Sequence, residues 1–135
     1  PNLIERVEGG LLSYGNDMTR DNTPHEAGLG RFCSTQTAIG CVGRDALLRV
    51  AKEGPLQQIR AIAIAGDVPP CDRGWPIMAG DLRVGLVTSA AASPDFGTGV
   101  AIGMVRMTHW DAGTVLQVKT PDGMREATVQ ETFWI

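Results

Sequence analysis

The sequence predicts an α+β fold that is mainly β, in which short helices precede an antiparallel β-barrel of about six strands. The chain changes character at Gly54-Pro55: helix-forming segments come before this pair, and short runs rich in Val, Ile and Ala come after it. These runs recur at regular spacing without helices between them, which is typical of an antiparallel barrel or sandwich rather than of βαβ units. We therefore expect two parts, residues 1–54 and residues 55–135.

The amino-terminal part begins with two predicted helices joined by a loop. Helix-forming residues from Leu3 onward stop at Gly9-Gly10, where the first helix is expected to end. In Thr23-Pro24-His25-Glu26, a Thr precedes a Pro at the first helical position and a Glu three residues after the Thr. This order is that of a capping box, and it predicts a short helix from Thr23 to about Gly28 or Gly30.

A third helix and the strands complete the predicted fold. Apolar residues at helical spacing between Val42 and Ala51, with Gly54-Pro55 as a stop, predict a helix over about 43–53. Strands are predicted at 58–66, 76–80, 82–93, 99–107, 114–120 and 125–131. Asp122-Gly123, between the last two, is the strongest short hairpin signal in the chain.

Composition limits the classes of function. The 135 residues are 43% hydrophobic and 20% charged with a net charge of -3, a globular profile that gives no reason to expect a nucleic acid as partner. No apolar run is long enough to cross a membrane, and no basic, then apolar leader is present, so we expect no membrane partner. The chain begins with Pro1 rather than Met, and we expect a fragment of a longer polypeptide.

The residue pattern by itself assigns neither a catalytic nor a metal-binding residue. Cys33, Cys41 and Cys71 fit neither a metal knuckle nor a paired framework, which favours reduced thiols in the cytoplasm. The carboxylates show no spacing that singles out an acid/base couple. Arg6 and Tyr14 are residue types that most often lie at a surface, and spacing alone gives them no further role.

Four blocks of sequence, taken in order, resemble the carboxy-terminal part of the aminomethyltransferase (glycine cleavage T-protein) family. The family forms are close to R-x-E-A-G-x-x-L-Y-G-x-D, T-P-x-E-A-G-L, F-x-G-R-E-A-L and G-x-V-T-S-G-x-x-S-P-x-x-G. The blocks here are RVEGG with LSYGNDM (6–18), TPHEAGLG (23–30), VGRDAL (42–47), and VGLVTS with Ser93-Pro94 and Gly97 (84–97). Each block is weak alone, but four in order form a specific signal that spans most of the chain.

The resemblance implies a fold, a cofactor and site residues. Members have a carboxy-terminal antiparallel barrel, so residues 1–54 are expected to be the tail of a folate-binding domain and 55–135 the barrel. The family transfers a one-carbon unit to N5 of tetrahydrofolate, and its catalytic aspartate lies upstream of this segment, so the fragment alone is expected to be inactive. Arg6 matches the family's folate-contacting arginine, and Tyr14 lies on the loop that lines the same channel. A guanidinium can pair with a folate carboxylate, and a phenol ring offers a flat face with a polar tip.

The wording of GGLLSYGNDM (9–18) is more similar to the dimethylsulfoniopropionate demethylase branch than to the T-protein branch. That branch implies a small-molecule methyl donor and the upstream part of the same chain as partners. The T-protein alternative implies an aminomethyl donor on a lipoyl carrier protein, and a third reading is a non-catalytic folate-binding or assembly module. Cys41, Ala90 and the end of the chain at Ile135 depart from the family pattern.

Overall fold

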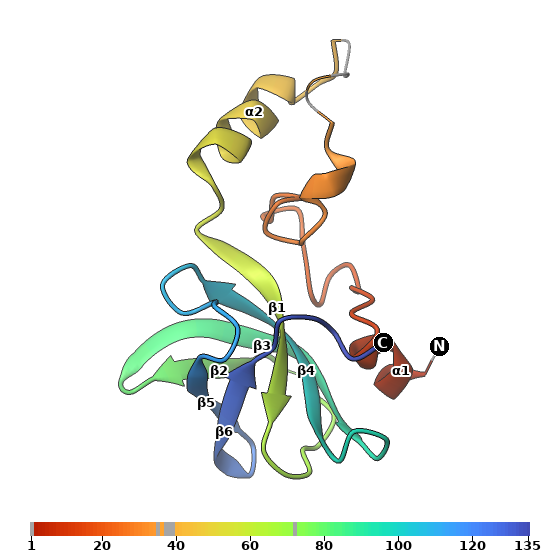
Figure 1. Ribbon diagram of the computed structural model, residues 1–135, viewed down its shortest axis with the longest axis vertical. Coiled ribbons are helices and arrows are strands. Elements are labelled where there is room, and N and C mark those ends of the chain that lie inside the picture. Colours follow the sequence, from red (N-terminus) through yellow and green to blue (C-terminus); the bar gives the residue numbers. More distant parts are fainter. Residues whose placement is uncertain (1, 35, 37–39, 72) are drawn as a thin grey trace.

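The computed structural model describes residues 2–34, 36, 40–71 and 73–135. In these residues the chain forms a barrel with helices and loops before it (Figure 1). The helices are α1 (Leu3–Glu8), the 3-10 turn η1 (Gly30–Phe32) and α2 (Arg44–Glu53). The strands are β1 (Gln57–Ile64), β2 (Trp75–Ala79), β3 (Leu82–Ser93), β4 (Thr98–Arg106), β5 (Val115–Thr120) and β6 (Gly123–Val129).

The six described strands close into an antiparallel barrel in the order β1-β4-β3-β2-β5-β6, with β6 pairing back to β1. This confirms the fold class that the sequence predicts, including a hairpin between β5 and β6 in which Thr120 pairs with Gly123. The interior is filled by β-branched and small side chains that the closed sheet removes from water. Ile62, Ile64, Ile77, Val87, Val105, Val118 and Val129 are among its fully buried members.

A second apolar cluster lies on the outside of the barrel, beneath α1. Val7 of α1 is fully buried against Ile59, Val100, Ile102 and Met104, with Leu12, Phe133 and Trp134 at its edge. Residues 99–105 of β4 are therefore buried on both faces and lack the alternation of a half-exposed strand. The carboxy-terminal residues return to the same place, because Trp134 N donates to Glu8 O at 2.9 Å. Figure 1 accordingly shows the carboxy terminus beside α1.

The capping box at Thr23 forms, but the helix expected after it does not. Glu26 N donates to Thr23 Oγ1 at 3.2 Å, and Thr23 N donates to the Glu26 carboxylate at 3.3 Å. Gly28 then adopts φ +73°, and Leu29 N closes onto Pro24 O at 2.8 Å, the pattern of a Schellman helix end. The start and stop signals lie so close together that only turns remain between them.

Helix α2 confirms the prediction for 43–53, yet none of its residues is buried. It extends away from the barrel, beside the segment that contains η1 (Figure 1). The predicted division at 54/55 lies just before β1, the first strand of the barrel. Helix α1 precedes that division in the sequence, yet it packs on the barrel. As a domain boundary, the division stays a prediction.

Arg60 holds the loop after β4 in place through contacts with Trp110. Arg60 on β1 donates to Trp110 O at 3.0 Å, and its guanidinium lies 5.3 Å from the centre of the Trp110 ring. Burial lowers the pKa of Arg60, and the nearby Asp111 carboxylate partly offsets that shift. None of the helices in the described part of the chain has the length and apolar character needed to span a membrane.

Gly10→Ala is expected to destabilise the chain by about 2–4 kcal/mol, and Gly9→Ala to leave its stability within about 0.5 kcal/mol. Gly10 has φ +64°, and a Cβ there would lie 2.4 Å from the Phe133 ring. Gly9 has right-handed backbone geometry, and its Cβ would lie at least 3.3 Å from any neighbour outside the adjacent residues. Urea denaturation of both variants measures the difference, and equal midpoints would contradict the packing described for Phe133.

Candidate functional site

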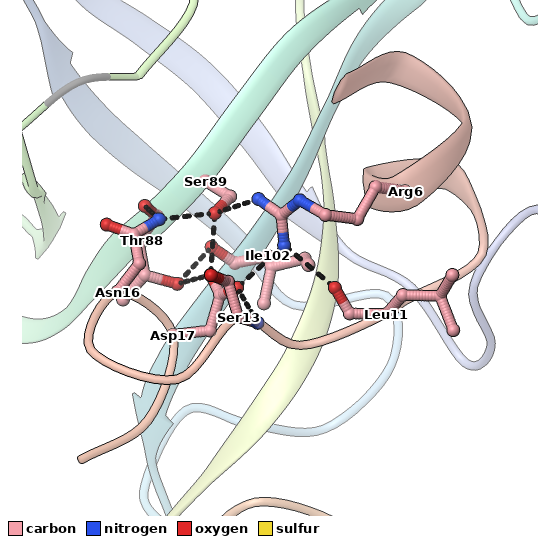
Figure 2. Close-up of polar contacts among 8 residues, drawn as sticks. All are labelled: Arg6, Leu11, Ser13, Asn16, Asp17, Thr88, Ser89 and Ile102. Carbon is pink, nitrogen blue, oxygen red and sulfur yellow. Dashed lines mark hydrogen bonds and ion pairs between the residues drawn. The ribbon is translucent and has the colours of Figure 1, made fainter. Parts of the chain in front are cut away.

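A buried polar network joins α1, the following loop and β3 (Figure 2). Its centre is the Asp17 side chain, which is 0% exposed and pairs with Arg6 at 2.8 Å between Oδ2 and Nη1. The hydroxyls of Thr88 and Ser89 each donate to Asp17 Oδ1 at 2.6 Å, and Ser13 N donates to Oδ2 at 2.8 Å. The carboxylate thus accepts four hydrogen bonds, the full capacity of its two oxygens.

A β-bulge in β3 brings the two hydroxyls to the same oxygen. Neighbouring residues on a regular strand point to opposite faces of the sheet, so Thr88 and Ser89 would not normally meet one partner. The pairing of β3 with β4 shifts register between Val87 and Ser89, and Thr88 is the extra residue. The bulge therefore allows the hydroxyls of two consecutive residues to donate to the same carboxylate oxygen.

Arg6 is held by three acceptors. Its Nη1 donates to Leu11 O at 2.7 Å as well as to Asp17, and its Nη2 donates to Ser89 Oγ at 2.6 Å. Asn16 Nδ2 also donates to Ser89 Oγ at 2.8 Å and to Thr88 O at 2.9 Å. A carboxylate out of contact with water is tolerated only with a paired charge and complete hydrogen bonding, and this set supplies both.

The network fixes a tight loop that carries Tyr14 at its tip. Asp17 N donates to Ser13 O, and Gly15 N donates to Met18 O, so residues 13–18 fold back on themselves. Tyr14 is 65% exposed and faces solvent, whereas Arg6 faces the barrel. The structure thus places the two residues predicted for the folate site on one unit, with the arginine holding the loop and the tyrosine projecting from it.

A second buried carboxylate joins the same elements at the far end of β3. Ser93 Oγ donates to Glu8 Oε1 at 2.6 Å, and Phe96 N donates to Ser93 Oγ at 3.1 Å. Glu8 is only 4% exposed. The first and last of the four sequence blocks therefore meet at two points, one at Asp17 and one at Glu8.

A cavity of about 410 Å³ lies beside the network, between the loop and the outside of the barrel. Its loop side is formed by Asn16–Thr19 and Asn22, and its barrel side by Gly85, Leu86, Thr88 and Met104. Gln57, Arg83 and Arg106 complete the lining. No group of His, Cys, Asp or Glu within the described ranges could hold a metal ion.

Sequence reasoning predicted Arg6 and Tyr14 for the folate site, which stays a prediction, and it missed Asp17, Thr88 and Ser89 of the buried network. Thr88 and Ser89 lie 71 and 72 positions after Asp17 in the sequence, so no local spacing connects them to it. The available signal was the order of the blocks, because Asp17 lies in the first block and Thr88-Ser89 lies in the last.

These observations define the chain first as a closed antiparallel barrel domain with its preceding helix packed on the outer face. The sequence model of the family described as the glycine cleavage T-protein C-terminal barrel domain matches residues 57–134. The chain therefore belongs to this family. The expected family resemblance is thereby confirmed.

Relatives extend the similarity to nearly the whole chain. A dimethylsulfoniopropionate demethylase of Ruegeria pomeroyi is 58% identical over 134 residues, which is 99% of this chain and 36% of that protein. An aminomethyltransferase of Symbiobacterium thermophilum is 32% identical over 127 residues, 94% of this chain and 34% of that protein. The crystal structure of glycine cleavage system aminomethyltransferase T from Bartonella henselae matches with a TM-score of 0.84 at 26% identity, covering 96% of this chain and 37% of that one. The chain spans about a third of the length of each.

Arg6→Met and Asp17→Asn are each expected to destabilise the chain by about 3–5 kcal/mol, because each leaves a buried partner without its charge. The double variant should lose about 1–3 kcal/mol less than the sum of the two. Urea denaturation of all four proteins gives this coupling free energy. Additive losses would show that the two side chains do not act as a unit.

Proposed function

We propose that this chain is the carboxy-terminal barrel of a tetrahydrofolate-dependent methyltransferase that removes a methyl group from dimethylsulfoniopropionate. The observation that carries the proposal is the 58% identity to the Ruegeria pomeroyi demethylase over 134 residues, against 32% to the Symbiobacterium thermophilum aminomethyltransferase. The upstream part of the same polypeptide would supply the catalytic residues and the rest of the folate pocket. A cytoplasmic location stays a prediction.

The proposed reaction makes modest chemical demands on this segment. A sulfonium readily gives up a methyl group: the carbon–sulfur bond breaks, the sulfur keeps the electron pair, and it becomes the uncharged sulfur of a thioether that still carries its carboxylate. N5 of tetrahydrofolate would form the new bond to the methyl carbon and release its proton to solvent. The protein's task is then to hold donor and acceptor in line and to exclude water. The charged side chains of the network are all engaged with one another, which suits positioning rather than proton transfer.

The residues at the outer edge of the loop are suited to contact with a bound folate. Tyr14 presents an exposed ring suited to stacking, and the adjoining cavity has apolar walls at Leu86 and Met104 beside cationic side chains. The Arg6 guanidinium already has three acceptors. We therefore assign Arg6 the role of a positioning residue that acts on folate through the loop, and Tyr14 the direct contact.

The exposed helix α2 supports an upstream partner. Its apolar residues recur at helical spacing, yet none is buried in this chain. An amphipathic helix of this kind normally covers a core, and the missing upstream part of the polypeptide is the proposed occupant.

A glycine cleavage aminomethyltransferase is the second candidate, supported by the family model and by the fold of the Bartonella henselae structure. That reaction would require a lipoyl carrier protein as partner. A non-catalytic folate-binding module is the third. Calorimetry of the isolated 135 residues with tetrahydrofolate tests it: weak or undetectable binding is expected, and micromolar binding would favour the module.

The complete parent protein is expected to convert dimethylsulfoniopropionate and tetrahydrofolate to 5-methyltetrahydrofolate without any lipoyl carrier. Chromatographic detection of 5-methyltetrahydrofolate measures this. No turnover, together with activity on an aminomethyl-lipoyl donor, would assign the protein to the aminomethyltransferase branch instead.

Tyr14→Ala in the complete protein should raise the KM for tetrahydrofolate about three- to tenfold, the loss of one aromatic contact. Because the side chain is exposed, the stability should change by less than about 0.5 kcal/mol. Phe32→Ala is the matched control, since Phe32 is 68% exposed and lies on η1. An unchanged KM in Tyr14→Ala, or an equal rise in the control, would remove Tyr14 from the site.

A further inference from the structure

Two arginines border the cavity beside the network, and neither forms an ion pair with a carboxylate among the described residues. Arg83 comes from β3 and Arg106 from the end of β4, and both line the cavity of about 410 Å³. Arg83 Nε donates weakly to Gly85 O at 3.4 Å. Across the described part of the chain, the ion pair that forms is that of Arg6 with Asp17, and neither Arg83 nor Arg106 takes part in one.

The charges around the cavity leave it electropositive. Asp17 lines it, but Arg6 neutralises that carboxylate. Glu26 borders a neighbouring pocket together with Arg106, and its carboxylate accepts from Asn22 Nδ2 at 3.1 Å and from Thr23 N at 3.3 Å. Two exposed arginines therefore line one cavity in a chain whose net charge is -3. Guanidiniums are well suited to binding carboxylates, because their planar fork can make two parallel hydrogen bonds.

We propose that Arg83 and Arg106 form a carboxylate subsite at the edge of the cavity. The proposal rests on the proposed function and deepens it. Two sources of carboxylate exist in that reaction: the γ-linked glutamates of a polyglutamyl tetrahydrofolate and the carboxylate of dimethylsulfoniopropionate.

The glutamyl tail fits the cavity better than the donor does. Each added glutamate brings one more carboxylate, and a chain of them can reach both arginines along an open rim. The donor is short and carries a sulfonium, so binding its carboxylate here would hold a third positive charge close to the two guanidiniums. The apolar walls at Leu86 and Met104 can pack against the methylene groups of a glutamyl chain.

The test uses Arg83→Gln with Arg106→Gln in the complete parent protein. Arg31→Gln with Arg125→Gln is the matched control, because it removes the same two charges from elsewhere on the chain. KM values are measured for tetrahydrofolate triglutamate, for the monoglutamate and for dimethylsulfoniopropionate. Calorimetric titration with the two folates is done in parallel, because it requires no turnover.

The KM and the dissociation constant for the triglutamate should rise about three- to tenfold in the test variant, with a smaller change for the monoglutamate and none in kcat. Added salt should weaken triglutamate binding in the wild type more than in the variant. A rise confined to the donor's KM would support the subsite with the donor as its source. All constants within twofold of the wild type, or an equal loss in the control, would overturn the subsite. Absence of turnover in the wild type would count against the proposed reaction alone, since the titrations decide the subsite independently.

Discussion

The ion pair between Arg6 and Asp17 is the interaction on which the site depends. A carboxylate that is 0% exposed costs several kcal/mol unless charge and hydrogen bonds compensate it, and here every acceptor position of Asp17 is filled. The donors come from α1, from the loop and from β3, so the pair can form only when these three segments are assembled together. The position of Tyr14 and the inner wall of the cavity follow from that assembly.

The barrel supplies the rigid half of this arrangement. The bulge at Thr88 lets consecutive hydroxyls reach one oxygen, and the closed sheet keeps their backbone fixed. Helix α1 is fastened to β3 at two points: Arg6, with Asp17, binds near the middle of the strand at Ser89, and Glu8 binds Ser93 at the strand's end. A loop supported in this way is suited to close one side of a ligand channel, because its tip is exposed while its base is buried.

Much of the fold could be predicted from local pattern, whereas the network could not. The strands and α2 follow from periodicity and turn residues, which act over a few positions. The helix expected after Thr23 failed because Gly28, with φ +73°, ends it within one turn, so two correct local signals left no room for a helix. The contacts of Asp17 with β3 bridge more than 70 residues and depend on a bulge, which no local spacing announces. Arg6 and Tyr14 were predicted as folate-site residues through family wording alone, and the part that each plays in folate binding stays a prediction.

Hydrogen exchange of the complete parent protein, with and without tetrahydrofolate, tests the central claim most directly: that the loop held by Arg6 and Asp17 forms one edge of the folate site. Amides of residues 11–18 are read by mass spectrometry, with β5 and β6 as internal references. The account predicts that folate slows exchange in this loop and leaves the two reference strands unchanged. Slower exchange confined to the upstream part of the protein, with no change in residues 11–18, would contradict it.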